Sequence, residues 1–151
     1  MIRKAIMNDV KPIQKLLEHY GQQGQLLPRS LSELYSYLRD FYVYIPEGED
    51  QPRGNCALHL CWEDLAEIKS LAVDENYAGQ GAGSRLVEAC VSEAITLGVY
   101  KIFALTYRVS FFTRLGFKVV DKSLLPHKIW ADCLQCVKFP SCDEIAVLLE
   151  V

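Results

Sequence analysis

The sequence predicts an α/β fold in which a mixed β-sheet is flanked by about four helices. Runs rich in β-branched and aromatic residues, which are typical of strands, alternate with segments whose apolar residues recur at helical spacing. The resulting order of elements is β-α-α-β-β-β-α-β-α-β-β, without an internal repeat. At 151 residues, of which 50% are hydrophobic, the chain has the size and composition of a single domain spanning residues 1–151.

The N-terminal half is expected to supply the first two helices and four strands. Asn8-Asp9 ends the first strand, and we expect it to cap the first helix, because short polar side chains accept hydrogen bonds at helix starts. Ser30 and Glu33 have the spacing of a capping box, which begins the second helix. Strands are predicted at residues 2–6, 41–45, 55–62 and 65–73, the last two forming a hairpin that turns at Glu63-Asp64.

The C-terminal half is expected to supply two more helices and the remaining strands. A helix begins at Gly81 and ends near Gly98, which has the position of a C-cap glycine. A short helix is predicted at 110–115, and strands are predicted at 101–106, 117–120 and 145–149.

Composition and charge exclude several classes of protein. The net charge of −3 and the pI near 5.6 argue against nucleic acid as a partner, because no basic stripe is present. No segment approaches the roughly 18 consecutive apolar residues of a membrane span, and the N-terminus lacks the apolar run of a signal peptide. We therefore expect a cytoplasmic protein without a membrane partner, in which the six cysteines stay reduced.

A glycine-rich loop between a strand and a helix is the feature that points most directly to a ligand. Gly79, Gly81 and Gly83 follow the strand at 65–73 and lead into the next helix, so that backbone N–H groups can cradle a phosphate. A Walker loop would end in Gly-Lys-Ser/Thr, whereas this loop ends in Gly-Ser-Arg. A dinucleotide loop would need Gly-x-Gly-x-x-Gly and an acid where Thr106-Tyr107 stands. This loop therefore matches neither the Walker motif nor the dinucleotide-binding motif.

Two motifs together resemble the GCN5-related N-acetyltransferases. Ala78-Gly79-Gln80-Gly81-Ala82-Gly83, after Leu71-Ala72-Val73, resembles the acyl-CoA loop of that superfamily. Phe111-Phe112-Thr113-Arg114-Leu115-Gly116-Phe117 resembles its second signature, a short helix running into Gly-Phe. The resemblance implies a mixed sheet that is splayed at its centre, with acetyl-CoA as the co-substrate. It implies cofactor contacts at Leu71, Ala72, Val73, Gly79, Gln80, Gly81, Ala82, Gly83, Ser84 and Phe112.

Two positions depart from the superfamily pattern. The family loop usually begins with Arg or Gln, where this chain has Ala78, so one side-chain contact to phosphate is missing. The second signature usually carries a Tyr that acts as general acid toward the leaving thiolate, and here Phe112 stands at that position. The first departure leaves the backbone amides of Gln80 to Ser84 to bind phosphate. The second leaves the acid to another residue or to none, because a thiol of low pKa can leave without one. Both departures also favour the alternative of a module that has lost catalysis.

A narrower resemblance extends over most of the chain. Residues 27–34, Leu-Pro-Arg-Ser-Leu-Ser-Glu-Leu, and the tail from Leu124 to Trp130 look like short stand-alone glutamate N-acetyltransferases of bacterial arginine biosynthesis. This implies acetyl transfer to the α-amine of a small amino acid, L-glutamate above all, by direct attack in a ternary complex. Acetylation of another amine or of a protein, and a non-catalytic acyl-CoA or metal-binding regulatory module, are the alternatives. The sequence leaves a homodimer open.

Glu67 and Tyr107 are the candidate catalytic residues. A base must remove a proton from the amine, and Glu67 lies on the strand that leads into the loop, where histone-type members of the superfamily place their base. The alternative is a solvated pair between Glu67 and Lys69. Tyr107 is the phenol nearest to the missing general acid, or it only packs at the strand end.

Arg29 is the candidate anchor for the acceptor substrate. A guanidinium grips a carboxylate through two parallel hydrogen bonds, which suits an amino acid with a free α-carboxylate. The alternative is a surface arginine near a helix start. Lys69 and Arg108 are candidates for holding a second carboxylate.

The C-terminal cysteines form a candidate metal site. Cys133, Cys136 and Cys142, with His127 upstream, would offer three thiolates and one imidazole, a donor set that suits zinc. The alternative is that these are reduced thiols which pack a tail.

Overall fold

The computed structural model describes residues 1–24, 29–125 and 144–151. Contacts divide the chain into two compact units. Unit 1 comprises Met1–His59 and Ile68–Glu93, and unit 2 comprises Leu60–Glu67 and Ala94–Val151. None of the described helices is long and apolar enough to span a membrane.

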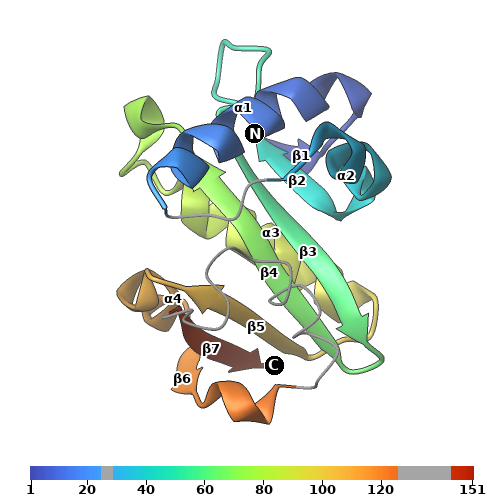
Figure 1. The fold of residues 1–151 in the computed structure, drawn as a ribbon, viewed down its shortest axis with the longest axis vertical. Helices are drawn as coiled ribbons and strands as arrows, with labels where there is room; N and C mark the ends of the chain where they lie inside the picture. The colour runs from blue at the N-terminus through green and yellow to red at the C-terminus, as the bar shows by residue number, and fades with distance from the viewer. Residues whose placement is uncertain (25–28, 126–143) are drawn as a thin grey trace. The chain divides into compact units, whose positions relative to one another are not determined.

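Seven strands form a mixed sheet in the order β1-β2-β3-β4-β5-β7-β6 (Figure 1). The parallel pair joins β4 and β5, with Ala66 opposite Ile102 and Glu67 opposite Phe103. The pairs β1–β2, β2–β3, β5–β7 and β6–β7 are antiparallel. The strands are β1 (Ile2–Lys4), β2 (Phe41–Tyr44), β3 (Gly54–Trp62), β4 (Leu65–Val73), β5 (Lys101–Thr106), β6 (Lys118–Val120) and β7 (Ile145–Glu150).

The described part of the chain contains four α-helices, as the sequence predicts. They are α1 (Val10–Gln22), α2 (Leu31–Ser36), α3 (Ala82–Thr96) and α4 (Val109–Arg114). The capping box at the start of α2 is confirmed, because the Ser30 side chain accepts from the Glu33 N–H and Glu33 accepts from the Ser30 N–H. Gly98, which follows α3, has a φ of +82°, as a C-cap glycine requires.

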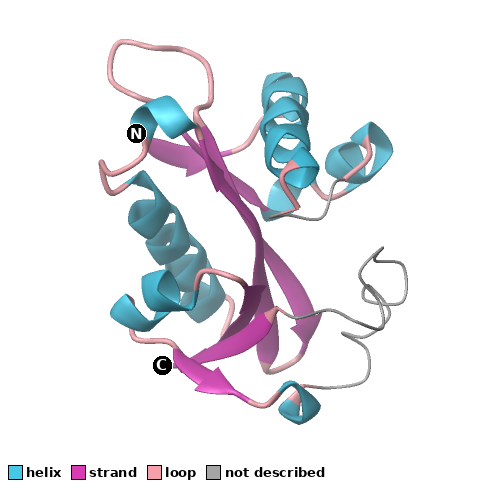
Figure 2. Ribbon diagram, turned by 60° about the vertical axis from the view of Figure 1, so that its left-hand side comes forward, coloured by secondary structure: helices cyan, strands magenta, loops and turns pink. Residues whose placement is uncertain are grey.

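Unit 1 holds its strands between helices. In Figure 2, α1 and α2 lie on one side of the strands of this unit and α3 lies on the other. The core beneath α1 and α2 includes Ile13, Leu17, Leu34 and Phe41, all nearly inaccessible to solvent. On the α3 side, Cys56 of β3 and Cys90 of α3 are buried free thiols. These contacts hold β3 and the second half of β4 in place, and β4 leads into the glycine loop.

Unit 2 has a smaller core of its own. Phe103 of β5 packs with Leu65, Leu125 and Ala146 in a buried cluster. The strand β7 pairs with β5 over six residue pairs, from Lys101 opposite Glu150 to Thr106 opposite Ile145. This unit carries the end of β5 and the helix α4 that follows it.

The prediction that Asn8-Asp9 caps the first helix is wrong in its detail. The Asp9 carboxylate turns back toward the preceding turn, where it accepts from the Ile6 N–H at 2.8 Å. It also forms an ion pair with Arg3 of β1 at 2.7 Å. Because Asp9 is 3% exposed, its buried charge needs the Arg3 guanidinium, and no side-chain cap remains for α1.

Candidate active site

The glycine loop joins β4 to α3 through a short turn at Glu75–Tyr77. Gly79 and Gly81 both have a φ of +80°, a left-handed conformation that favours glycine. A Cβ atom built on either residue would meet nothing within 4 Å. The requirement for glycine is therefore conformational, and the surface above both residues is open to a ligand.

Backbone N–H groups at the start of α3 form an anion-binding end. The Gly81 carbonyl accepts from the Arg85 N–H at 3.1 Å, which makes Gly81 the first residue of the helical hydrogen-bond pattern. The N–H groups of the first turn have no partner within the helix, and they lie at the positive end of its dipole. Gln80 and Gly81 are exposed beside them. A helix start of this kind suits an anion held by backbone N–H groups, and its contact with the pyrophosphate of coenzyme A stays a prediction.

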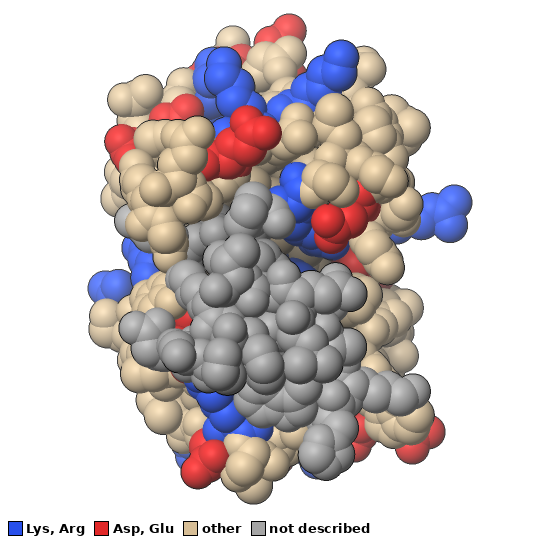
Figure 3. All heavy atoms as spheres, viewed as in Figure 1, with Lys and Arg blue, Asp and Glu red and all other residues tan. Residues whose placement is uncertain are grey.

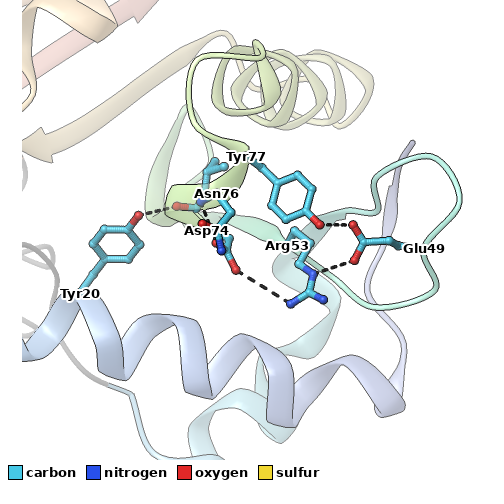
Figure 4. Close-up of polar contacts among 7 residues, drawn as sticks. Tyr20, Glu49, Arg53, Asp74, Asn76 and Tyr77 are labelled. Carbon is cyan, nitrogen blue, oxygen red and sulfur yellow. Dashed lines mark hydrogen bonds and ion pairs between the residues drawn. The ribbon is translucent and has the colours of Figure 1, made fainter.

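A polar network that the sequence analysis missed holds the segment before the loop (Figure 4). Tyr20 of α1 donates its hydroxyl hydrogen to the Val73 carbonyl. The Asp74 N–H donates to the Arg53 carbonyl at 2.8 Å, and the Arg53 guanidinium lies 3.9 Å from the Asp74 carboxylate. Arg53 also pairs with Glu49 at 2.9 Å. The end of β4 is thus tied to α1 and to the loop before β3.

Glu49 is the acidic centre of this network. Tyr77 donates a hydrogen bond to its carboxylate, and this bond, followed by the bond from Arg53, lowers the pKa of Glu49. The same Glu49 bond is the main cause that raises the pKa of the Tyr77 phenol. The network is therefore arranged for an ionised Glu49 and a neutral Tyr77.

Unit 1 also contains an open cleft of about 630 Å³. None of the predicted site residues lines it. Its acids are already engaged, Asp74 by Arg53 and Glu75 by His19 at 2.9 Å. The lining is formed by Lys11, Pro12, Lys15, Leu16, His19, Gln51, Pro52, Arg53, Asp74, Glu75 and Asn76.

Arg29 lies where a carboxylate would find an oriented cation. Its guanidinium carbon is 5.4 Å from the centre of the Phe41 ring and 5.6 Å from that of Tyr37. Its Nη1 atom is 3.5 Å from the Ser70 Oγ atom. No carboxylate of the described residues forms an ion pair with Arg29. Among the described residues, the charge is thus contacted by two ring faces and a hydroxyl.

Ser70 is the one described residue other than glycine with a positive φ, at 56°. Its carbonyl accepts from the Asn55 Nδ2 atom at 2.7 Å. Asn55 is 1% exposed, and among the described residues no donor reaches its Oδ1 atom. Neither residue is among the site residues that the sequence predicts. Asn at the second position of a mostly apolar strand is the signal that could have found this contact, since Asn is depleted from strands.

The predicted cofactor residues of β4 differ in burial. Ala72 packs in the core of unit 1, whereas the side chains of Leu71 and Val73 are half-buried. Ser84 and Gly83 lie in the first turn of α3. The end of β4 therefore leaves the side chains of Leu71 and Val73 partly accessible, while that of Ala72 is buried.

Unit 2 carries the two candidate catalytic residues and one candidate substrate residue, Glu67, Tyr107 and Arg108. Glu67 of β4 is 8% exposed and stands opposite Phe103 of β5. Tyr107, which directly follows β5, is 41% exposed. Arg108 precedes α4, where its N–H donates to the Thr106 hydroxyl at 2.8 Å. Glu67 is thus a buried carboxylate on β4, and Tyr107 is an accessible phenol at the end of β5, the parallel neighbour of β4.

Phe112 is buried in an aromatic cluster of unit 2. Its ring meets Phe111 and Phe117 edge to face, at centroid distances of 5.1 and 5.2 Å. The Arg108 guanidinium lies 5.4 Å from the centre of the Phe111 ring. The residue at the usual general-acid position thus packs α4 against the following strand, and its contact with the cofactor stays a prediction.

The candidate zinc ligands His127, Cys133, Cys136 and Cys142 lie outside the described residues. Within residues 1–24, 29–125 and 144–151, no group of three or more His, Cys, Asp or Glu side chains could hold a metal ion. On the face drawn in Figure 3, Lys and Arg side chains are interspersed with Asp and Glu side chains among the residues shown in colour. The residues shown in colour therefore form no extended patch of a single sign.

Comparison with known proteins identifies the family. The model of the acetyltransferase (GNAT) family matches residues 11–117, so the chain belongs to this family. An N-acetyltransferase of Chlorobaculum tepidum, described as uncharacterized, is 39% identical over 147 residues, which are 97% of this chain and 94% of that protein. The amino-acid acetyltransferase of Mycobacterium tuberculosis is 34% identical over 122 residues, 80% of this chain and 70% of that protein.

The fold has a close match among solved structures. N-acetylglutamate synthase from Neisseria gonorrhoeae, complexed with coenzyme A and N-acetyl-glutamate, superposes with a TM-score of 0.88 at 26% identity. The match covers 99% of this chain but 34% of that one, so this chain spans about a third of the length of that synthase. The protein is thus an acetyl-CoA-dependent N-acetyltransferase with the GNAT fold.

Proposed function

We propose that this chain transfers the acetyl group of acetyl-CoA to the α-amine of a free amino acid, with L-glutamate as its acceptor. The observation that carries the proposal is the Arg29 guanidinium, which has two aromatic faces and the Ser70 hydroxyl around it and no carboxylate partner among the described residues. The α-carboxylate of an amino acid supplies the missing charge and accepts the planar pair of N–H groups. The relatives named as amino-acid acetyltransferases support this acceptor class.

Acetyl-CoA supplies an acetyl thioester, whose carbonyl carbon is attacked by the neutral amine as the coenzyme A thiolate leaves. Glu67 takes the proton that the ammonium form of the acceptor must lose. After attack the nitrogen loses a second proton to solvent, and Tyr107 gives its proton to the leaving sulfur and is reprotonated from solvent. Lys69 and Arg108 are each a candidate cation for the second carboxylate of a dicarboxylic acceptor. The N–H groups of residues 80–84 hold the pyrophosphate of the donor. The supporting facts are the burial of Glu67 and the exposure of Tyr107 at the end of β5.

An acceptor panel tests the proposal. The full chain is incubated with acetyl-CoA and one acceptor at a time, and free thiol is followed while the product is identified by mass spectrometry. The panel contains L-glutamate, L-glutamine, L-aspartate, L-lysine, L-glutamate α-amide and a short peptide with a free N-terminus. We expect the highest kcat/KM for L-glutamate and a large loss for its α-amide. Thiol release with the peptide but not with free amino acids would indicate a protein acetyltransferase, and none with any amine would indicate a regulatory module.

A further inference from the structure

Asn55 of β3 contacts Ser70 of β4. Ser70 has a φ of 56° within a strand, and this left-handed conformation is unfavourable for a residue with a Cβ atom. The conformation must be held by its surroundings. The hydrogen bond from Asn55 Nδ2 to the Ser70 carbonyl, at 2.7 Å, is the contact that holds it.

The Asn55 amide is half satisfied by hydrogen bonds. Only its amide nitrogen can donate to a carbonyl, so the bond to Ser70 fixes which way the amide points. Its Oδ1 atom then lies buried, and no donor among the described residues reaches it. A desolvated acceptor without a donor destabilises the folded state, and the bond to the Ser70 carbonyl opposes that loss. The one described hydrogen bond of this amide is thus directed at Ser70.

Ser70 stands beside the cation that we assign to the acceptor. Arg29 Nη1 donates to Ser70 Oγ over 3.5 Å, which leaves the hydroxyl hydrogen of Ser70 able to donate to another group. A carboxylate oxygen placed between them can accept from the guanidinium and from the hydroxyl at once. The position of Ser70 Oγ depends on the backbone of Ser70, and that backbone is the part which Asn55 holds.

We propose that Asn55 is a positioning residue which holds Ser70 in its left-handed conformation, so that the Ser70 hydroxyl and the Arg29 guanidinium together bind the carboxylate of the acceptor. This inference rests on the proposed function, because it deepens the assignment of that carboxylate site. It assigns Ser70 a direct contact with the acceptor and assigns Asn55 an effect that passes through Ser70.

A double-mutant cycle tests the proposal on the full chain. Glycine adopts a positive φ at no steric cost, so Ser70→Gly removes the need for Asn55 along with the hydroxyl. We expect Asn55→Ala and Ser70→Gly each to raise the acceptor KM about tenfold and to leave the KM for acetyl-CoA within twofold. The double variant should be no worse than Ser70→Gly alone, and the drop in Tm caused by Asn55→Ala should shrink in the glycine background. Effects that multiply to about a hundredfold in KM, with equal Tm losses in both backgrounds, would overturn the proposal.

A matched control separates positioning from packing. Cys56, the next residue of β3, is also fully buried, and its thiol faces Cys90 rather than Ser70. Cys56→Ala should lower the Tm and leave the acceptor KM unchanged. If Asn55→Ala does not fold, Ser70→Ala serves instead, because it keeps the strained backbone and removes only the hydroxyl. An unchanged acceptor KM in Ser70→Ala would overturn the assignment of Ser70.

The two proposals fail in different ways. The Tm cycle needs no substrate, so it reports the coupling of Asn55 to Ser70 even in a protein that acetylates nothing. Coupling in Tm without turnover of any carboxylate-bearing acceptor would refute the proposed function, and with it the carboxylate site. Turnover of L-glutamate without coupling would refute the inference about Asn55 alone.

Discussion

Replacing Arg29 removes the charge that we assign to the acceptor carboxylate. The guanidinium is partly exposed, and a hydrogen bond to a charged group contributes about 1.5–3 kcal/mol. Arg29→Ala should therefore lower kcat/KM for L-glutamate by about 10- to 150-fold, since about 1.4 kcal/mol corresponds to a factor of ten. The loss should fall on the acceptor KM, because the contact is present before and after the chemical step. Arg29→Lys keeps the charge but not the planar fork, so it should recover only part of the loss.

The assay compares two acceptors in two proteins. Wild-type protein should discriminate strongly between L-glutamate and its α-amide, which lacks the α-carboxylate charge, whereas Arg29→Ala should treat them nearly alike. Arg39 provides the matched control, because it lies exposed in the turn before β2 and Arg39→Ala makes the same change in net charge. Equal loss for both acceptors in Arg29→Ala, or the same loss in Arg39→Ala, would refute the assignment of Arg29.

Three further predictions concern the base, the loop and acid pH. Glu67→Gln should lower kcat by about 10²–10⁴-fold at neutral pH and should remove the acidic limb of the pH–rate profile. A full rate at every pH would exclude Glu67 as the base. Gly81→Ala places a residue with a Cβ atom at a φ of +80°, and it should weaken coenzyme A binding about tenfold, as measured by calorimetry. The control Gly98→Ala makes the same change at a φ of +82° and should lower the Tm without changing that affinity. The hydrogen bond from Tyr77 lowers the folded-state pKa of Glu49. The stabilisation by Glu49 is therefore complete above its unfolded-state pKa of about 4.3. It is lost as the pH falls through the folded-state pKa. The Tm of Glu49→Gln should accordingly fall less than that of wild type between pH 5 and pH 3, and parallel curves would contradict this.

Local signals in the sequence were enough to place the elements. The capping box from Ser30 to Glu33, the glycine after α3 and the strand at Lys101–Thr106 all stand where the residues predict them. Each of these features depends on neighbours within a few positions of the chain, so a single sequence contains the needed information. The glycine loop is of the same kind, because the spacing of Gly79 and Gly81 reports their backbone conformation directly.

Features that depend on distant partners could not be predicted in the same way. The carboxylate of Asp9 turns away from α1 because Arg3 of β1 pairs with it, and sequence spacing does not reveal that pairing. The left-handed Ser70 is held by Asn55, fifteen positions earlier, and serine gives no sign of a positive φ. The chemistry of a guanidinium and the family resemblance make Arg29 a candidate, and the structure adds the two rings and the hydroxyl that lie against it.

A crystal structure of the full chain with coenzyme A and N-acetyl-L-glutamate tests the central claim most directly. We predict that one carboxylate of the ligand lies within hydrogen-bond distance of both Arg29 Nη1 and Ser70 Oγ, with the pyrophosphate on the N–H groups of residues 80–84. An N-acetyl-L-glutamate whose carboxylates both face solvent or other cations, with Arg29 still packed between Tyr37 and Phe41, would contradict the account.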